Sequence, residues 1–256
     1  MNKATLLAAI CGVLAVGCGG PATENDEIVS NLIQAGFPAD DIQIVDGKVY
    51  VGNDAHVTLE ASREMIQTVS GTSEEQYRTT NLVGSSVTKI CVNPTSTWNS
   101  YTKLSQGLDL AIANYNALGL RFTLARGPTT GCSANIAAKT TGGGAGGSSG
   151  FPSGGLPYNT INVSTATTSY STDVNEHVIT HELGHTIGMR HSDYYNRAIS
   201  CGGSPTNEGS AGIGAILIPG TPSTATVGGS IMNSCFRSTE TGEFTSSDRT
   251  ALQTVY

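Results

Sequence analysis

Basic residues are scarce in this chain, and no segment beyond residue 18 is apolar enough to span a membrane. Lysine and arginine together number 13, against 20 acidic residues, so the formal net charge is −7. The acidity is concentrated in residues 21–85, which hold eleven acids and three bases, whereas residues 86–256 hold nine of each. Because neither part carries the basic stripe of a nucleic-acid-binding protein, we expect no nucleic-acid partner.

The first 18 residues are expected to be a targeting signal and not part of the fold. Lys3 supplies a positive charge, and Leu6 to Val16 form an apolar run that is too short for a permanent membrane helix. The Gly17-Cys18 junction resembles a bacterial lipoprotein signal, in which Cys18 would carry the lipid. Ordinary secretion is the alternative. We therefore expect an exported protein that meets the membrane only through a lipid on Cys18.

Two of the six cysteines belong to this signal. The other four form an even number in a chain with an export signal, which indicates two disulfides. We expect the pairs Cys91–Cys132 and Cys201–Cys235, because each pair then stays on one side of the histidine-rich segment 181–191. A zinc site made of the four cysteines is the alternative, and their wide, irregular spacings disfavour it.

Residues 19–85 are expected to form a small acidic module followed by a linker. Helical spacing of apolar residues predicts one helix over 28–33 and another over 59–69. Asp-Gly between two short apolar runs predicts a β-hairpin over 42–51. The module is short for an independent core, so we expect it to pack against the larger domain. Residues 70–86 are polar, rich in Ser and Thr, and are expected to be the linker.

Residues 86–256 are expected to form one larger domain of strands and helices. The predicted strands cover 87–92, 121–124, 135–139 and 159–164, and the predicted helices cover 101–118, 173–188 and the end of the chain after residue 245. Residues 192–243 are expected to be rich in loops. The segment 142–155 is crowded with Gly and Ser, which indicates either a flexible loop or a sheet edge along which a peptide could add as a strand.

The most informative segment is His181 to His191, which follows the pattern H-E-x-x-H-x-x-G-x-x-H. His181 and His185 are four residues apart, so on a helix they lie on one face and can reach one metal ion. Gly188 permits a sharp turn that brings His191 back as a third ligand. Three histidines and one open position are typical of a catalytic zinc site, with Glu182 facing a metal-bound water as the general base.

This pattern resembles the zinc signature of the metzincin metallopeptidases, which carry a methionine turn further along the chain. Residues 230–233, Ser-Ile-Met-Asn, match that turn, so we expect Met232 to support the metal site by packing. Within this clan the chain is most similar to the dual-action HEIGH metallopeptidases, a secreted bacterial family, with Leu183 in place of the isoleucine. The resemblance extends from about Glu24 to Tyr256.

The resemblance implies an α+β fold and a peptidase activity. A metzincin-like catalytic domain, with a twisted mixed sheet, helices and a loop-rich lower lobe, would follow a small α/β pro-segment. We expect a monomeric zinc endopeptidase with one catalytic Zn²⁺ that acts on proteins or peptides. The alternatives are a surface-displayed module that holds zinc without turnover, which the presence of Glu182 disfavours, and a zinc hydrolase of a non-peptide substrate.

Several further residues could assist the metal site. His177 lies one turn before His181, where it could contact a ligand or simply pack. Some metzincins place a tyrosine two residues after the turn methionine, but Ser234 occupies that position here. The role is then absent or filled by Tyr194 or Tyr195, for which a place in the wall or surface is the simpler interpretation.

The acidic module could also hold the enzyme latent. Some metzincin pro-segments resemble this arrangement and place a carboxylate from a short Gly-Asp motif on the metal. The nearest match here is Val51-Gly52-Asn53-Asp54, with one inserted residue. Asp54 is therefore the candidate, because a carboxylate oxygen is a competent zinc ligand. His56 is a rival candidate, and the alternative is that Asp54 only ends the hairpin strand.

Overall fold

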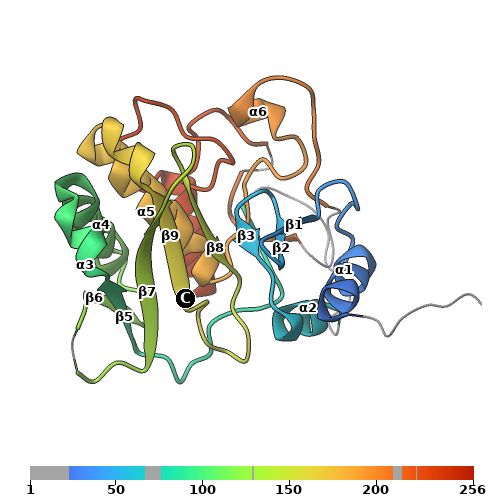
Figure 1. Cartoon of the computed structure of the whole chain (residues 1–256), viewed down its shortest axis with the longest axis horizontal. Coiled ribbons are helices and arrows are strands. Elements are labelled where there is room, and N and C mark those ends of the chain that lie inside the picture. Colours follow the sequence, from blue (N-terminus) through green and yellow to red (C-terminus); the bar gives the residue numbers. More distant parts are fainter. Residues whose placement is uncertain (1–22, 67–75, 129, 210–214, 223) are drawn as a thin grey trace, which may run out of the picture.

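The computed structural model describes residues 23–66, 76–128, 130–209, 215–222 and 224–256. Within these ranges the chain forms one eight-stranded mixed sheet in the order β1-β2-β3-β8-β9-β7-β5-β6, flanked by helices. Figure 1 shows the acidic module at one end of this sheet and the helices α3 and α4 at the other, while α5 lies against β8 and β9 in the middle. The α+β prediction is confirmed. In the described part of the chain, no helix is long and apolar enough to cross a membrane.

The acidic module consists of α1 (Glu24–Gln34), β1 (Gln43–Val45), β2 (Lys48–Val51), β3 (Ala55–His56) and α2 (Leu59–Met65). The predicted hairpin is confirmed, with Asp46 and Gly47 both at positive φ as a tight two-residue turn requires. The module has its own apolar cluster, which also contains Phe151 of the larger domain. The structure therefore confirms that the module packs against that domain. Strand β3 was not predicted, and it continues the sheet by pairing with β8 (Gly147–Gly150).

The linker expected over 70–86 is wrong for the part that the structure describes. Residues 70–75 lie outside the described residues, but from Gln76 onward the chain is packed into the larger domain. Strand β4 (Tyr77–Arg78) pairs with β10 (Ile216–Leu217), and the Arg190 amide donates to the Tyr77 carbonyl at 2.8 Å. The polar composition of this stretch concealed this packing, in which Tyr77 and Val83 are buried.

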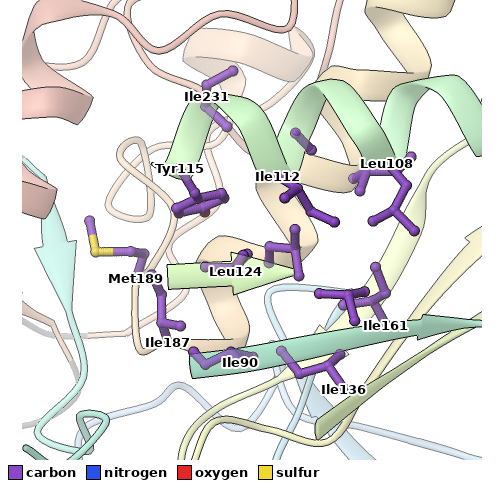
Figure 2. Close-up of a cluster of buried hydrophobic side chains, with 14 of the residues drawn as sticks. Ile90, Leu108, Ile112, Tyr115, Leu124, Ile136, Ile161, Ile187, Met189 and Ile231 are labelled. Atoms are coloured by element: carbon purple, nitrogen blue, oxygen red, sulfur yellow. The ribbon is translucent and has the colours of Figure 1, made fainter. Parts of the chain in front are cut away.

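The larger domain contains a parallel array of β6 (Thr123–Arg126), β5 (Lys89–Pro94), β7 (Ala134–Thr141) and β9 (Thr160–Ser164), and β8 pairs antiparallel to β9. The glycine-rich stretch thus contains a strand within a loop. The helices of this domain are α3 (Ser96–Ser100), α4 (Thr102–Ala117), α5 (Thr172–Thr186), α6 (Ala198–Cys201) and α7 (Ser246–Val255), with a 3-10 helix over Thr165–Ser169. Figure 2 shows Leu108, Ile112 and Tyr115 of α4 facing apolar side chains of the strands.

The helix that carries the histidine motif begins differently from the prediction. The sequence pattern placed the cap at 173, but the N-cap of α5 is Ser171, whose hydroxyl accepts from the Val174 amide. The helix then packs against α4 at Gly107, where an added Cβ would lie 2.9 Å from the backbone nitrogen of Glu176. This close approach packs α5 tightly against α4, and α5 also contacts β8 and β9 of the sheet. Both expected disulfides, Cys91–Cys132 and Cys201–Cys235, are confirmed.

Candidate metal centre and active site

Helix α5 presents His181, Glu182 and His185 inside the domain, each less than a tenth exposed. Every residue from Val174 to Thr186 of this helix is buried, although many of them are polar. Burial of polar side chains costs free energy unless they are hydrogen-bonded or bind a ligand. A helix of this composition in the core therefore indicates a functional site.

The turn after α5 brings the third histidine to the other two. Gly188 has φ +102°, and an added Cβ would lie 2.5 Å from the carbonyl oxygen of Asn81, so both the backbone conformation and the space require glycine. The ring centroid of His181 then lies 4.7 Å from that of His185 and 5.1 Å from that of His191, and the centroids of His185 and His191 are 4.9 Å apart. The structure thus brings together the three histidines that the spacing predicted as ligands.

Each imidazole is oriented through its Nδ1 atom. Nδ1 of His181 lies 2.9 Å from the carbonyl oxygen of Ile231, and Nδ1 of His185 lies 2.8 Å from that of Met189. Because a carbonyl oxygen can only accept, these Nδ1 atoms carry the proton and leave the Nε2 lone pairs free. Nδ1 of His191 faces the Glu208 carboxylate at 2.8 Å.

Asp54 of the acidic module lies in the middle of this cluster. Its Oδ2 atom is 3.0 Å from Nε2 of His191 and 3.6 Å from Nε2 of His181, and its Oδ1 atom is 3.6 Å from Nε2 of His185. One ligand atom from each of the four residues lies within 4.8 Å of the other three. Burial would raise the pKa of Asp54, but the imidazoles of His191 and His185 outweigh it and hold that pKa well below its usual range.

The donor set fits a divalent metal ion. Nε2 of His185 and Oδ1 of Asp54 are buried and have no hydrogen-bond partner among the residues described. Nε2 of His181 and Nε2 of His191 face each other at 3.2 Å, which places two acceptor nitrogens together unless one is protonated or a cation lies between them. Three imidazoles and a carboxylate are ligands that Zn²⁺ prefers in a tetrahedral site.

Glu182 faces the same space from the helix but is not a member of the ligand cluster. Its Oε2 atom is buried without a hydrogen-bond partner in the described structure. An added Cβ on Gly147 of β8 would lie 2.5 Å from its Oε1 atom, so glycine at 147 makes room for the carboxylate. Burial and the nearby Asp54 carboxylate raise the pKa of Glu182 well above its usual range.

Met232 lies against α5 at the level of the ligands. A Cβ on Gly184 would be 2.6 Å from its sulfur, so the glycine before His185 allows the methionine to pack there. The carboxylate of Asp248, at the start of α7, accepts from the Ile231 amide at 3.0 Å and from the Ser230 hydroxyl. Asp248 thereby fixes the turn whose carbonyl orients His181, a role that the sequence analysis did not predict.

Glu208 was also missed, although it contacts a predicted ligand. It is 2 % exposed, and besides His191 it pairs with Arg197 at 3.1 Å and lies 3.7 Å from Arg190. Ser234, at the position where a tyrosine was considered, donates to it at 3.2 Å. Glu208 lies 17 residues after His191 in a loop segment, where no regular spacing could reveal it.

The remaining candidates lie outside the ligand cluster. Nδ1 of His56 is 2.6 Å from the Tyr158 hydroxyl. Tyr194 packs on Tyr77 with ring centroids 4.3 Å apart, and the Tyr195 hydroxyl accepts from the Ala225 amide. The structure thus favours the wall interpretation for both tyrosines. His177 lines a cavity beside the cluster.

A family model places the chain in a class of peptidases. The model of the dual-action HEIGH metallo-peptidase matches residues 49–256, so the chain belongs to this family. It is therefore a metallopeptidase, its substrates are proteins or peptides, and a metal ion is implied, which the cluster of three histidines and Asp54 fits.

Two solved structures of myroilysin are similar to the chain over part of its length. The first has 17% sequence identity and a TM-score of 0.40, and the match covers 69% of this chain and 86% of the myroilysin chain. The second has 18% sequence identity and a TM-score of 0.38, and the match covers 68% of this chain and 97% of the myroilysin chain. No curated protein matches the chain.

The Glu208–His191 contact generates the first prediction. Replacing Glu208 with Gln keeps an acceptor but removes the charge that makes His191 a stronger ligand, so zinc affinity should fall by about 10–100-fold. Competition with a chromophoric chelator measures this affinity. Glu243→Gln, on the surface, is the matched control and should leave it unchanged. Equal zinc affinity in the two variants would contradict the assigned role of Glu208.

Proposed function

We propose that the protein is an exported, zinc-dependent endopeptidase of the metzincin type, made as a latent precursor. The observation that carries this proposal is the arrangement of three imidazoles with fixed Nδ1 atoms and converging Nε2 atoms beside the buried Glu182, whose Oε2 atom has no hydrogen-bond partner among the described residues. His181, His185 and His191 would hold Zn²⁺, and Met232 would support them by packing. When bound, zinc supplies Lewis-acid polarisation of the scissile carbonyl and acidifies a water molecule.

Glu182 is the proposed general base. Its unpaired Oε2 atom lies in the site, and its raised pKa suits a group that must first accept a proton and then release it. The carboxylate would take a proton from the attacking water and pass one to the nitrogen of the leaving amine. Because its desolvated position is set by α5 and the space at Gly147, the carboxylate needs no rearrangement to perform both transfers.

The edge of β8 that faces the acidic module is the proposed binding edge for the substrate. Residues Gly147–Gly150 form its short strand, next to Glu182, and glycine there lets another backbone approach closely. In the precursor this edge pairs in parallel with β3, with Ala55 opposite Ser149. A substrate would add to the same edge after β3 leaves.

One consideration disfavours each of the two alternative functions. A zinc-holding module without turnover does not need a buried base beside its metal, and a non-peptide hydrolase would not belong to a peptidase family. Both considerations favour the peptidase.

Replacing Glu182 with Ala should abolish cleavage while leaving the metal in place. We expect zinc content to match the wild-type protein and the rate of casein or gelatin cleavage to fall by about 10²–10⁴-fold, because only proton transfer is lost. Metal analysis and a protease assay, with a chelator as reference, measure the two effects. A variant that still cleaves at nearly the wild-type rate would require another base.

We further propose that Asp54 keeps the precursor latent by occupying the metal position needed by water. The support is its 3.0 Å approach to His191 and its contacts with the other two ligands. The neighbouring residue Gly52 packs tightly there, since an added Cβ would lie 3.0 Å from Oε2 of Glu208 and 3.2 Å from the His191 ring. The pairing of β3 with β8 would block the substrate edge at the same time.

The latency proposal predicts premature activity in the full-length Asp54→Ala variant before any processing. His56→Ala is the control, because its side chain bonds Tyr158 and not the ligand cluster. A quenched fluorescent peptide assay on both precursors measures the difference. If both stay equally latent, the module blocks the cleft by its bulk or does not inhibit through Asp54.

The proposal that the protein is exported rests on the signal, the two disulfides and the acidic module. More specifically, we propose that Cys18 carries a lipid. The expected oligomeric state is a monomer. Residues 1–22 lie outside the described structure. A mass spectrum of the protein purified from its host should show a mature chain that begins at Cys18 with added lipid mass. An unmodified chain that begins elsewhere would replace this proposal by ordinary secretion.

A further inference from the structure

A cavity of about 280 Å³ opens beside the proposed catalytic residues. His181 and Glu182 form one side of it, Gly147 of β8 another, and Asn233 to Phe236 after the methionine turn a third. Asn53 and Asp54 of the acidic module close the remaining side. The cavity therefore adjoins the place where the scissile bond would lie, and departure of the module would open it.

The cavity wall contains a buried histidine whose ring nitrogens lack partners. His177 is 3 % exposed, and neither Nδ1 nor Nε2 makes a hydrogen bond within the described residues. The Glu240 carboxylate is 3.8 Å from Nδ1 and is itself bonded to Arg237. Burial lowers the pKa of His177 to about 4, so the ring is neutral and offers one donor and one acceptor.

A guanidinium group meets the same cavity from the N-terminus of α6. The Arg197 side chain is 12 % exposed, and its Nε atom pairs with Glu208 at 3.1 Å. Complementarity of donors and acceptors orients the Asn53 amide with its oxygen toward Arg197, where it accepts from Nη2 at 2.9 Å and also from Nη1. The acidic module thus already places an amide side chain against the free end of this guanidinium.

We propose that this cavity is the specificity pocket of the enzyme and that it selects a substrate side chain ending in an acceptor oxygen, a carboxylate or an amide. Arg197 is the main donor, and His177 is a second polar contact. This inference rests on the proposed peptidase function and adds the class of side chain recognised next to the cleaved bond.

The selectivity follows from what an apolar side chain would leave unpaired. Once Asn53 withdraws, the Nη atoms of Arg197 lose their acceptor, and Glu208 continues to pair with Nε. A leucine or phenylalanine in the pocket would displace water from these donors without replacing its hydrogen bonds, which is costly. Val178 and Phe236 in the wall provide apolar contact for the methylene groups of a polar side chain.

The test is a cleavage profile of the zinc-loaded protein after proteolytic activation, measured by mass spectrometry on a peptide library. We expect enrichment of Asp, Glu, Asn or Gln at one fixed position beside the cleaved bond. Enrichment of the two acids identifies the carboxylate as the preferred group, and enrichment of the two amides identifies the amide.

Two variants assign the preference to the pocket. For each protein, kcat/KM is measured on a peptide with the preferred residue and on the same peptide with Ala at that position. The ratio of the two values should fall about tenfold or more in Arg197→Met and also fall in His177→Phe, since hydrogen bonds to a charged or buried group are lost. Arg249→Met, an exposed arginine on α7, is the matched control and should keep the wild-type ratio.

The possible outcomes distinguish a failure of the pocket inference from a failure of the proposed function. Cleavage without enrichment, enrichment of apolar residues only, or an unchanged ratio in both Arg197→Met and His177→Phe overturns the pocket inference and leaves the peptidase intact. Activated, zinc-loaded protein that cuts no peptide overturns the proposed function, and the pocket inference with it. Because His177 does not contact Glu208, its variant remains informative if Arg197→Met loses zinc.

Discussion

The rest of the structure depends on one arrangement, in which three buried imidazoles direct their Nε2 atoms to the same region. Two of them donate from Nδ1 to carbonyl oxygens, and the third faces a carboxylate. One ligand atom from each imidazole and one oxygen of Asp54 lie within 4.8 Å of one another in a buried site, an arrangement that a bound cation would stabilise. The fold must therefore supply both the ligands and the groups that hold them in orientation.

Buried carboxylates supply much of that support in the half of the domain that has few strands and helices. Asp248 holds the methionine turn, and Glu208 faces His191. Asp193 accepts from the amide and hydroxyl of Ser234, and also from the hydroxyl of Ser200. The Cys201–Cys235 disulfide joins the segments that contain Ser200 and Ser234. Hydrogen bonds and a covalent link thus replace regular secondary structure around the site.

The same network would connect the proposed latency with the proposed recognition of the substrate. Gly52, Asn53 and Asp54 approach, in turn, the Glu208–His191 pair, the Arg197 guanidinium and the ligand cluster. Three consecutive residues of the acidic module therefore cover the metal site and the adjoining cavity. Release of this segment would expose the proposed ligand position, binding edge and specificity pocket together.

Sequence alone predicted the features that depend on local periodicity. The helix spacing of His181 and His185, the turn at Gly188 and the Asp46-Gly47 hairpin all have short-range signals, and each is present. The two disulfides span 41 and 34 residues, and they were predicted from the even number of cysteines and from their positions on either side of the histidine segment. Strand β3 has only two residues and takes its partner from a distant part of the chain, so no period could reveal it.

Contacts that connect distant loops could not be predicted from the sequence either. Glu208 and Asp248 act through tertiary hydrogen bonds, and the packing of residues 76–85 into the larger domain uses backbone groups that every residue possesses. Asp54 was predicted by its resemblance to a motif, but its distance from the histidines required the fold.

Zinc K-edge X-ray absorption on the zinc-loaded full-length precursor tests the central claim most directly. We expect scattering from three imidazoles and from a carboxylate oxygen at about 2.0–2.2 Å, with the oxygen contribution altered in Asp54→Ala. A shell with sulfur at about 2.3 Å, or with fewer than three imidazoles, would contradict the assignment of His181, His185, His191 and Asp54 as the ligands of one metal ion.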